Sequence, residues 1–255
     1  MVGTFTTNND NKNALNEYLA KKLIDLHQGS KLIITTFKNS VLCSSNTDID
    51  TSEVGVHSCQ SEEADQRLVR HLLNCICGNK KYSLIVIRTI DTDVMILVVA
   101  YVSEYQNMCS NTKVYVFMVN SNKMYDICAI VKFLRIYICH ALPFFYAVTG
   151  NDIVSFLYGQ GKCKAWEIWL NCDDNHQLTN LFQRLGDKPL GISEEDFGKL
   201  EEFVLEVYSM RQCSPLAEAC GEIFRTSPNS NLWKLPPGKD ALMLRPLTTY
   251  NSIFS

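Results

Sequence analysis

Residues 82–104 read YSLIVIRTIDTDVMILVVAYVSE, and this stretch decides the fold class. Its first part, Tyr82 to Ile90, is a continuous β-rich run that is typical of a strand buried on both faces. Its last part, Val94 to Glu104, predicts a helix. The motif Asp91-Thr92-Asp93 stands between the two, at the carboxyl end of the strand. Open α/β sheets bind ligands at that edge, so the stretch predicts an α/β fold with two carboxylates at its binding edge.

The segments on either side continue the α/β pattern. Apolar spacing predicts helices at 14–27 and from about 61 to 77, and Ser61 is a plausible N-cap of the second. Short strands are expected at 31–37, 41–43 and 113–119, followed by a turn at 121–123. Beyond Asp126 the pattern is almost wholly helical, and Pro143 is expected to divide the first pair of helices. Ser193-Glu194-Glu195-Asp196 predicts the start of a later helix.

Composition bounds the class of protein. At 255 residues and 46% hydrophobic, the chain can bury one large core, or one core plus a small helical annex. A formal net charge of −3 excludes a polyanion binder held by bulk charge, so any nucleic-acid contact has to be local. The eleven cysteines lack the regular framework of a secreted domain, and no basic-then-apolar leader opens the sequence. We therefore expect an intracellular protein, nuclear or cytoplasmic.

Two apolar stretches raise the question of a membrane span. The run Val94 to Val102 is about half of the ~20 residues that a helix needs to cross a bilayer. The longer run, Ile127 to Val148, carries Lys132 and Arg135 one helical turn apart on a single face. A solvated stripe on a mostly buried helix explains that spacing better than a span. We expect no membrane association, with a span at 127–148 as the alternative.

Five acidic residues fall into three separated clusters: Glu63 and Asp65 in E-A-D, Asp91 and Asp93 in D-T-D, and Asp152 in G-N-D. Carboxylates that gather in a half-buried crevice raise each other's pKa, so such a gathering needs a cation. Hard oxygen ligands without a matching Cys or His pattern favour Mg²⁺ or Mn²⁺ over zinc. We expect the five carboxylates to line one crevice at the carboxyl edge of the sheet.

Each acidic cluster also has a purely structural interpretation. Glu63 would lie in the first turn of a helix, where a carboxylate compensates the dipole by about 0.3–1 kcal/mol. Asp91 can cap the following helix, which places Asp93 in its first turn. Asp152, two residues after Gly150, can be a turn residue or an N-cap. Convergence of the clusters on one crevice is what separates the metal site from these alternatives.

A motif rich in glycine and lysine, Gly159-Gln160-Gly161-Lys162-Cys163-Lys164, follows Asp152 by seven residues. Two glycines one residue apart let the backbone approach a phosphate, and the start of the next helix adds positive potential. Lys162 and Lys164 would add charge at the contact without reading bases. The alternative is a tight turn into a helix.

The order of these motifs resembles the flap-endonuclease-like branch of the PIN-domain nucleases. The shared features are E-A-D, a buried strand that ends in D-x-D, and G-x-D followed seven residues later by G-x-G and a lysine. More closely, the motifs S-x-E-E-A-D, D-T-D-V, H-A-L-P with T-G-N-D, and G-x-G-K-x-K-A-W are similar to uncharacterised transposon-associated proteins of the same superfamily. The resemblance covers roughly Ala14 to Trp169.

The resemblance implies a PIN-like core at 1–172 with a mostly parallel central sheet flanked by helices, and a helical C-terminal extension at 173–255. In the family the acidic residues bind two divalent metal ions, Mg²⁺ or Mn²⁺. This implies metal ligation by Glu63, Asp65, Asp91, Asp93 and Asp152, with Glu63, Asp91 and Asp93 as the catalytic residues. A helix-hairpin-helix-like element at about 150–170 would hold the nucleic-acid backbone through Gly159, Gly161 and Lys164, with Lys162 adjacent.

The sequence departs from the family pattern in two places. No strand with an aspartate precedes Lys31, so we expect the core to lack its first strand and the two-ion site to be incomplete. The loop 44–58 has no Lys or Arg where the family has a basic arch. Two functions therefore stay open. The first is metal-dependent hydrolysis of phosphodiesters at nucleic-acid ends or branches, with DNA favoured over RNA. The second is a catalytically impaired module of transposon origin that binds nucleic acid or protein.

Overall fold

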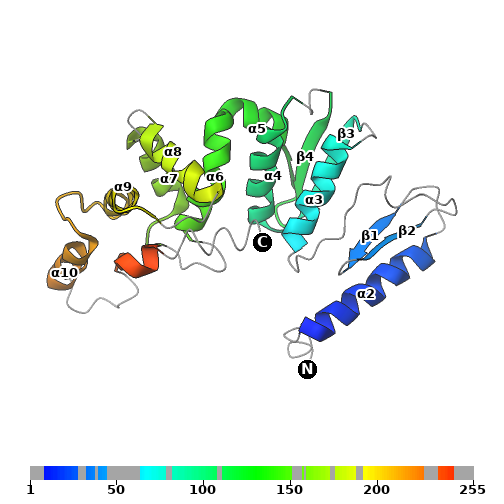
Figure 1. Cartoon of the computed structure of the whole chain (residues 1–255), viewed down its shortest axis with the longest axis horizontal. Helices are drawn as coiled ribbons and strands as arrows, with labels where there is room; N and C mark the ends of the chain where they lie inside the picture. Colours follow the sequence, from blue (N-terminus) through cyan, green and yellow to red (C-terminus); the bar gives the residue numbers. More distant parts are fainter. Residues whose placement is uncertain are drawn as a thin grey trace. The chain divides into compact units, whose positions relative to one another are not determined.

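The computed structural model describes residues 9–27, 33–37, 40–44, 64–78, 82–107, 111–150, 157, 159–172, 176–187, 192–226 and 235–243. The chain forms two compact units, Met1–Ile85 and Val86–Ser255. The described residues form a mixed α/β structure, in which helices accompany a small three-stranded open sheet and a two-stranded hairpin (Figure 1).

The N-terminal unit contains a helix, a hairpin and a second helix. The helix α2 (Asn9–Leu26) packs on the strands β1 (Ile34–Phe37) and β2 (Ser40–Cys43), which pair antiparallel. Ser44 closes the open end of this hairpin, because its N–H donates to Ile33 O at 2.9 Å and its Oγ accepts from Ile33 N at 2.8 Å. The helix α3 (Ala64–Cys77) buries one apolar stripe: Val69, Leu72 and Ile76. The predicted N-cap of α3, Ser61, lies outside the described residues.

The larger unit begins within the first strand of a β-α-β arrangement. Its elements are β3 (Leu84–Thr89), α4 (Thr92–Glu104), β4 (Lys113–Met118) and β5 (Lys123–Asp126), with strand order β3-β4-β5. Val119 N–H donates to Thr89 O at 2.9 Å. The carboxyl ends of β3 and β4 therefore lie side by side, and the two strands run parallel around the α4 crossover.

Two features of this sheet differ from the sequence-based expectation. The strand β5 pairs antiparallel with β4, from Tyr115 opposite Asp126 to Met118 opposite Lys123, where only a turn was expected. The prediction that β3 is buried on both faces is wrong, because Ile87 is buried whereas Leu84 and Val86 are about half exposed. Successive side chains of a strand point to opposite faces of the sheet, so the face that carries Ile87 is covered and the face that carries Leu84 and Val86 is partly exposed.

A sharp bend joins the next two helices, α5 (Ile127–Leu134) and α6 (Ile136–Val148). The break falls at Arg135, whose φ of 68° ends α5, so the expected division at Pro143 is wrong. Pro143 lies buried inside α6 instead. Among the described helices none is by itself long and apolar enough to cross a membrane, while α5 and α6 meet that length and composition only as a pair bent by 101°.

Three of the helices that follow, α7 (Lys162–Cys172), α8 (Gln177–Asp187) and α9 (Glu194–Val207), share an aromatic core with α6. The helix α10 (Leu216–Thr226) comes after them in the chain. The Trp169 ring lies 4.9 Å from Phe145 of α6 and 5.3 Å from Phe182 of α8, centroid to centroid, and Phe182 lies 5.4 Å from Phe203 of α9. Trp169 Nε1 also donates to Thr179 Oγ1 at 2.9 Å. This core draws on residues from both sides of position 172, and the domain boundary predicted there stays a prediction.

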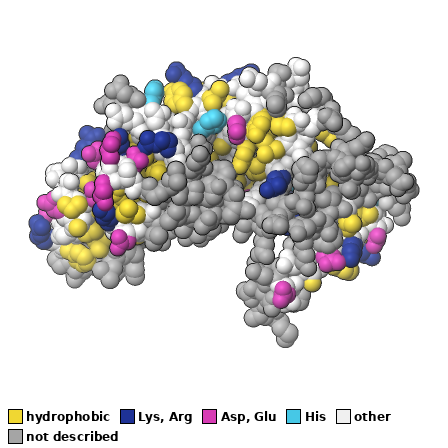
Figure 2. All heavy atoms as spheres, viewed as in Figure 1, with side chains coloured by type: hydrophobic (Ala, Val, Ile, Leu, Met, Phe, Trp, Pro, Cys, Tyr) yellow, Lys and Arg dark blue, Asp and Glu magenta, His cyan; other side chains and the backbone are white. Residues whose placement is uncertain are grey.

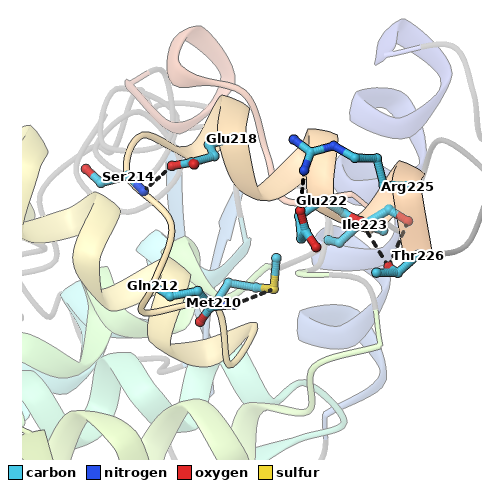
Figure 3. Close-up of polar contacts among 8 residues, drawn as sticks. All are labelled: Met210, Gln212, Ser214, Glu218, Glu222, Ile223, Arg225 and Thr226. Carbon is cyan, nitrogen blue, oxygen red and sulfur yellow. Dashed lines mark hydrogen bonds and ion pairs between the residues drawn. The ribbon is translucent and has the colours of Figure 1, made fainter.

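Side-chain caps fix the ends of the last helices. The Ser193 hydroxyl accepts from Asp196 N at 3.0 Å, which confirms the predicted start of α9. Before α10, Ser214 N–H donates to Glu218 Oε2 at 3.0 Å, and Arg225 pairs with Glu222 at 2.7 Å (Figure 3). Figure 2 shows acidic and basic side chains interleaved over this end of the larger unit, which agrees with the small net charge of the chain.

Candidate functional site

The D-T-D motif forms the junction between β3 and α4, as the sequence predicts. Asp91 is the N-cap of α4: its backbone is extended, and its Oδ1 accepts from Asp93 N at 3.0 Å. The Asp91 N–H in turn donates to Thr89 Oγ1 at 3.0 Å. The capping interpretation of Asp91 is therefore confirmed. It occupies one carboxylate oxygen, and Asp91 Oδ2 has no hydrogen bond within the part of the chain that the structure describes.

A tyrosine from the far end of α6 reaches this junction. The Tyr146 hydroxyl lies 2.8 Å from Thr92 Oγ1, although 54 positions separate the two residues. Burial raises the pKa of Tyr146 to about 12, and the carboxylates of Asp93 and Asp91 act in the same direction. The hydroxyl is therefore protonated at neutral pH and can donate a hydrogen bond beside the two aspartates.

Lys162, the first lysine of the glycine motif, bonds to groups at the carboxyl end of α6, the helix that carries Tyr146. Lys162 Nζ donates to Tyr146 O at 2.8 Å, to Thr149 Oγ1 at 3.0 Å and also to Gly150 O. It lies 3.7 Å from the centroid of the Tyr146 ring. The last carbonyls of a helix carry the negative end of its dipole, so an ammonium group is favourable there. Lys162 thus joins the start of α7 to the end of α6.

Tyr146 connects three of the predicted motifs. Its hydroxyl lies at D-T-D, its ring and carbonyl hold Lys162 of the glycine motif, and Thr149-Gly150 of T-G-N-D share that lysine. Sequence reasoning did not select Tyr146. The available signal was its position three residues before Thr149, since residues three or four apart share a helix face.

The glycine motif has the conformation of a turn into a helix. Gly159 has a φ of 70°, in the region that favours glycine, and α7 begins at Lys162. A Cβ built at Gly159 or at Gly161 would meet nothing within 4 Å among the described residues, so the space beside both glycines is open. Lys164 Nζ donates to Gln160 Oε1 at 2.8 Å and to Ser209 Oγ at 3.2 Å. Phosphate contacts by this motif stay a prediction.

The described residues supply only part of the predicted acidic crevice. Glu63 and Asp152 lie outside the described residues, and Asp65 lies in the first turn of α3, in the N-terminal unit. Asp91 and Asp93 are together at the start of α4. Among the residues that the structure describes, no group of three or more His, Cys, Asp or Glu is placed to hold a metal ion. The oxygen atoms of the Asp91 and Asp93 carboxylates are ligands that suit Mg²⁺ or Mn²⁺. The convergence of all five predicted carboxylates on one crevice stays a prediction.

Comparison of the chain with protein-family models, with curated proteins and with solved structures finds no match.

Proposed function

We propose that the chain is a divalent-metal-dependent nuclease with a PIN-like core, which hydrolyses phosphodiesters at nucleic-acid ends or branched structures. The observation that supports it best is the tie from D-T-D through Tyr146 to Thr149-Gly150. Asp152 follows Gly150 by two residues, a reach of at most about 7 Å. A third carboxylate at the edge that carries Asp91 and Asp93 is therefore compatible with the chain.

The proposed metal ligands are Glu63, Asp65, Asp91, Asp93 and Asp152. Asp91 would offer its Oδ2 atom, because Oδ1 caps α4. The Tyr146 hydroxyl, next to Thr92 and Asp93, would hold the Asp93 carboxylate in place by hydrogen bonding. Bound Mg²⁺ or Mn²⁺ would activate a water molecule and stabilise the leaving oxygen.

The glycine motif would hold the nucleic-acid backbone. No described residue fills the space beside Gly159 and Gly161, where a phosphate would approach the backbone. Lys164 would add a charge at this point, since among the described residues its ammonium group bonds only to two neutral side chains, those of Gln160 and Ser209. Lys162 would keep the motif next to the carboxylates by its contacts with the end of α6.

A pair of substitutions at Asp91 tests the proposal, because the two replacements separate capping from metal binding. Asp91→Asn keeps a side-chain oxygen that can cap α4, whereas Asp91→Ala removes the cap and costs about 1 kcal/mol of stability. We expect the parent to cleave a labelled flap or single strand in Mn²⁺ or Mg²⁺, and to melt at a higher temperature with either ion.

Asp91→Asn should lose both the cleavage and the ion-dependent rise in melting temperature, while its stability in EDTA matches that of the parent. Asp91→Ala should lose both and also be less stable in EDTA. Equal cleavage by the parent and Asp91→Asn, or no thermal effect of either ion on the parent, would contradict the metal site.

A second function, a catalytically impaired binding module, is favoured by one observation. Asp91 and Lys162, two of the expected functional residues, both make structural contacts here: an N-cap and a closure of α6. Binding of nucleic acid without cleavage in either ion would support this module over the enzyme.

A further inference from the structure

The bend between α5 and α6 presents an aromatic side chain to solvent. Phe133 is 85% exposed, the highest value among the exposed large hydrophobic residues that the structure describes, and Ile136 across the bend is 47% exposed. Lys132 and Arg135 stand beside them in the sequence and are exposed as well. We call these four residues, Lys132, Phe133, Arg135 and Ile136, the bend patch.

No carboxylate among the described residues neutralises the positive charges of the bend patch. Lys132 forms no hydrogen bond or ion pair with the described residues, and Arg135 has only a 3.4 Å contact from NH1 to the neutral Tyr137 hydroxyl. The first turn of α6 contains no acidic residue. Five other cations of the larger unit each pair with a carboxylate: Arg184, Lys199, Arg211, Arg225 and Lys239. The bend patch is therefore a local site of positive charge on a chain of net charge −3.

The backbone under the bend patch is held on both sides. Ile127 and Val131 of α5 are buried, as are Ile138 and Cys139 of α6. The Arg135 N–H donates to Val131 O at 3.0 Å, and Arg135 O accepts from Cys139 N at 3.2 Å. The exposed side chains thus project from anchored helices, so little order has to be gained when a ligand binds.

We propose that the bend patch binds single-stranded nucleic acid, with one base stacked on Phe133 and flanking phosphates at Lys132 and Arg135. Every base has a flat face that stacks on an aromatic ring, and cations beside the ring contact the backbone without reading sequence. A duplex keeps its bases stacked on one another, so it cannot use the Phe133 ring in this way. This assignment rests on the proposed nuclease function, whose substrate class it names.

Fluorescence anisotropy of a labelled 20-nucleotide poly-dT, in EDTA and low salt, tests the bend patch without metal or cleavage. Phe133→Ala should weaken binding by about 5- to 150-fold, the range for removal of one stacked base. Phe133→Trp should bind as well as the parent or better. The double variant Lys132→Gln, Arg135→Gln should lose two phosphate contacts. Each contact with a single strand contributes about 0.7 to the slope of log K against log salt, so this slope should become less steep by about 1.4.

Phe224→Ala is the matched control. Phe224 is also exposed, at 39%, and stands next to an arginine, but Arg225 is already paired with Glu222 at 2.7 Å. This variant should bind poly-dT as the parent does. The variants at Phe133, Lys132 and Arg135 should keep the parent's melting temperature, because these side chains are exposed. Phe224→Ala should melt at a lower temperature, because more than half of the Phe224 side chain is covered.

Four results would overturn the assignment. The first three are that the parent does not bind poly-dT, that it binds a blunt duplex with the same affinity as poly-dT, or that Phe133→Ala and Phe224→Ala weaken its binding equally. The fourth result is that Phe133→Ala loses binding to anionic lipid vesicles but keeps binding to poly-dT. The last would assign the bend patch to a membrane surface. Failure here is distinct from failure of the nuclease proposal, which depends on ion-dependent melting and on Asp91. Poly-dT binding that depends on Phe133 without any cleavage would support the bend patch and contradict the nuclease.

Discussion

Replacement of Lys162 by methionine measures how strongly the glycine motif is tied to the end of α6. Methionine keeps most of the aliphatic length and removes the ammonium group. The variant lacks the bonds from Nζ to Tyr146 O at 2.8 Å, to Thr149 Oγ1 at 3.0 Å and to Gly150 O, together with the cation–π interaction at 3.7 Å. The helix end is also left without a favourable charge.

The expected destabilisation follows from what happens to each acceptor. Three hydrogen bonds at about 1 kcal/mol each give a total of about 3 kcal/mol. The half-buried position lowers this figure, because water can replace the ammonium group at some of the carbonyls. Thr149 also keeps its own bond to Phe145 O at 2.8 Å. We expect a destabilisation of about 2–3 kcal/mol, which moves the urea midpoint down by about 1 M for a slope of about 2–3 kcal/mol per M.

Urea unfolding in EDTA, followed by tryptophan fluorescence, is the assay. Two of the three tryptophans, Trp166 and Trp169, lie on α7 next to the contact and report on the larger unit. Lys164→Met is the control, because within the described part of the chain Lys164 bonds only to Gln160 and Ser209. Its loss should cost less than about 1 kcal/mol. If the urea midpoints of the two variants fell by equally small amounts, Lys162 would not hold α6 and α7 together. Its ammonium group would then be left for the phosphate contact that the sequence predicts.

Two further substitutions test the contacts around this tie. Tyr146→Phe removes the hydroxyl that bonds Thr92 and should cost about 1 kcal/mol at neutral pH. The folded state raises the pKa of Tyr146 from 10.0 to about 12, so the parent should lose stability as the pH rises between these values, and Tyr146→Phe should lose less. If the urea midpoints of the two proteins fell by the same amount from about pH 9 to about pH 12, this expectation would be contradicted. Trp169→Phe deletes the buried hydrogen bond from Nε1 to Thr179 Oγ1 and leaves a cavity, so it should lower the free energy of unfolding by about 2–4 kcal/mol. Trp166 is half-buried, and Trp166→Phe, the control, should lower it by about 1 kcal/mol; urea unfolding followed by circular dichroism measures both.

The sequence predicts elements well where periodicity and end signals agree. The strand before D-T-D, the helix after it and the Ser193 cap all combine an apolar pattern with a clear boundary residue. The errors occur where tertiary contacts decide. Arg135 ends α5 with a positive φ that no residue preference favours, and Pro143 is accommodated inside a buried helix. β5 depends on pairing with β4, because its four residues, K-M-Y-D, carry almost no strand pattern of their own.

The same distinction applies to the site. The sequence placed the D-T-D carboxylates at a strand end and Gly159 in a turn, since both follow from local order along the chain. It could not identify Tyr146, because the contacts of Tyr146 with Thr92 and with Lys162 join residues that are 54 and 16 positions apart. Only the packing of α6 against α4 and beside α7 brings them together.

The confirmed cap at Asp91 does not remove the case for a cation at this edge. A cap needs one hydrogen-bond acceptor, and Asn or Ser provides it about as well as Asp. Asp91 uses Oδ1 for the cap, while a second carboxylate, Asp93, follows two residues later beside the half-buried Tyr146. The start of α4 can stabilise each negative charge by about 0.3–1 kcal/mol, and the two charges repel each other. Capping therefore explains one oxygen atom of the pair, and a bound cation would explain why both residues are charged.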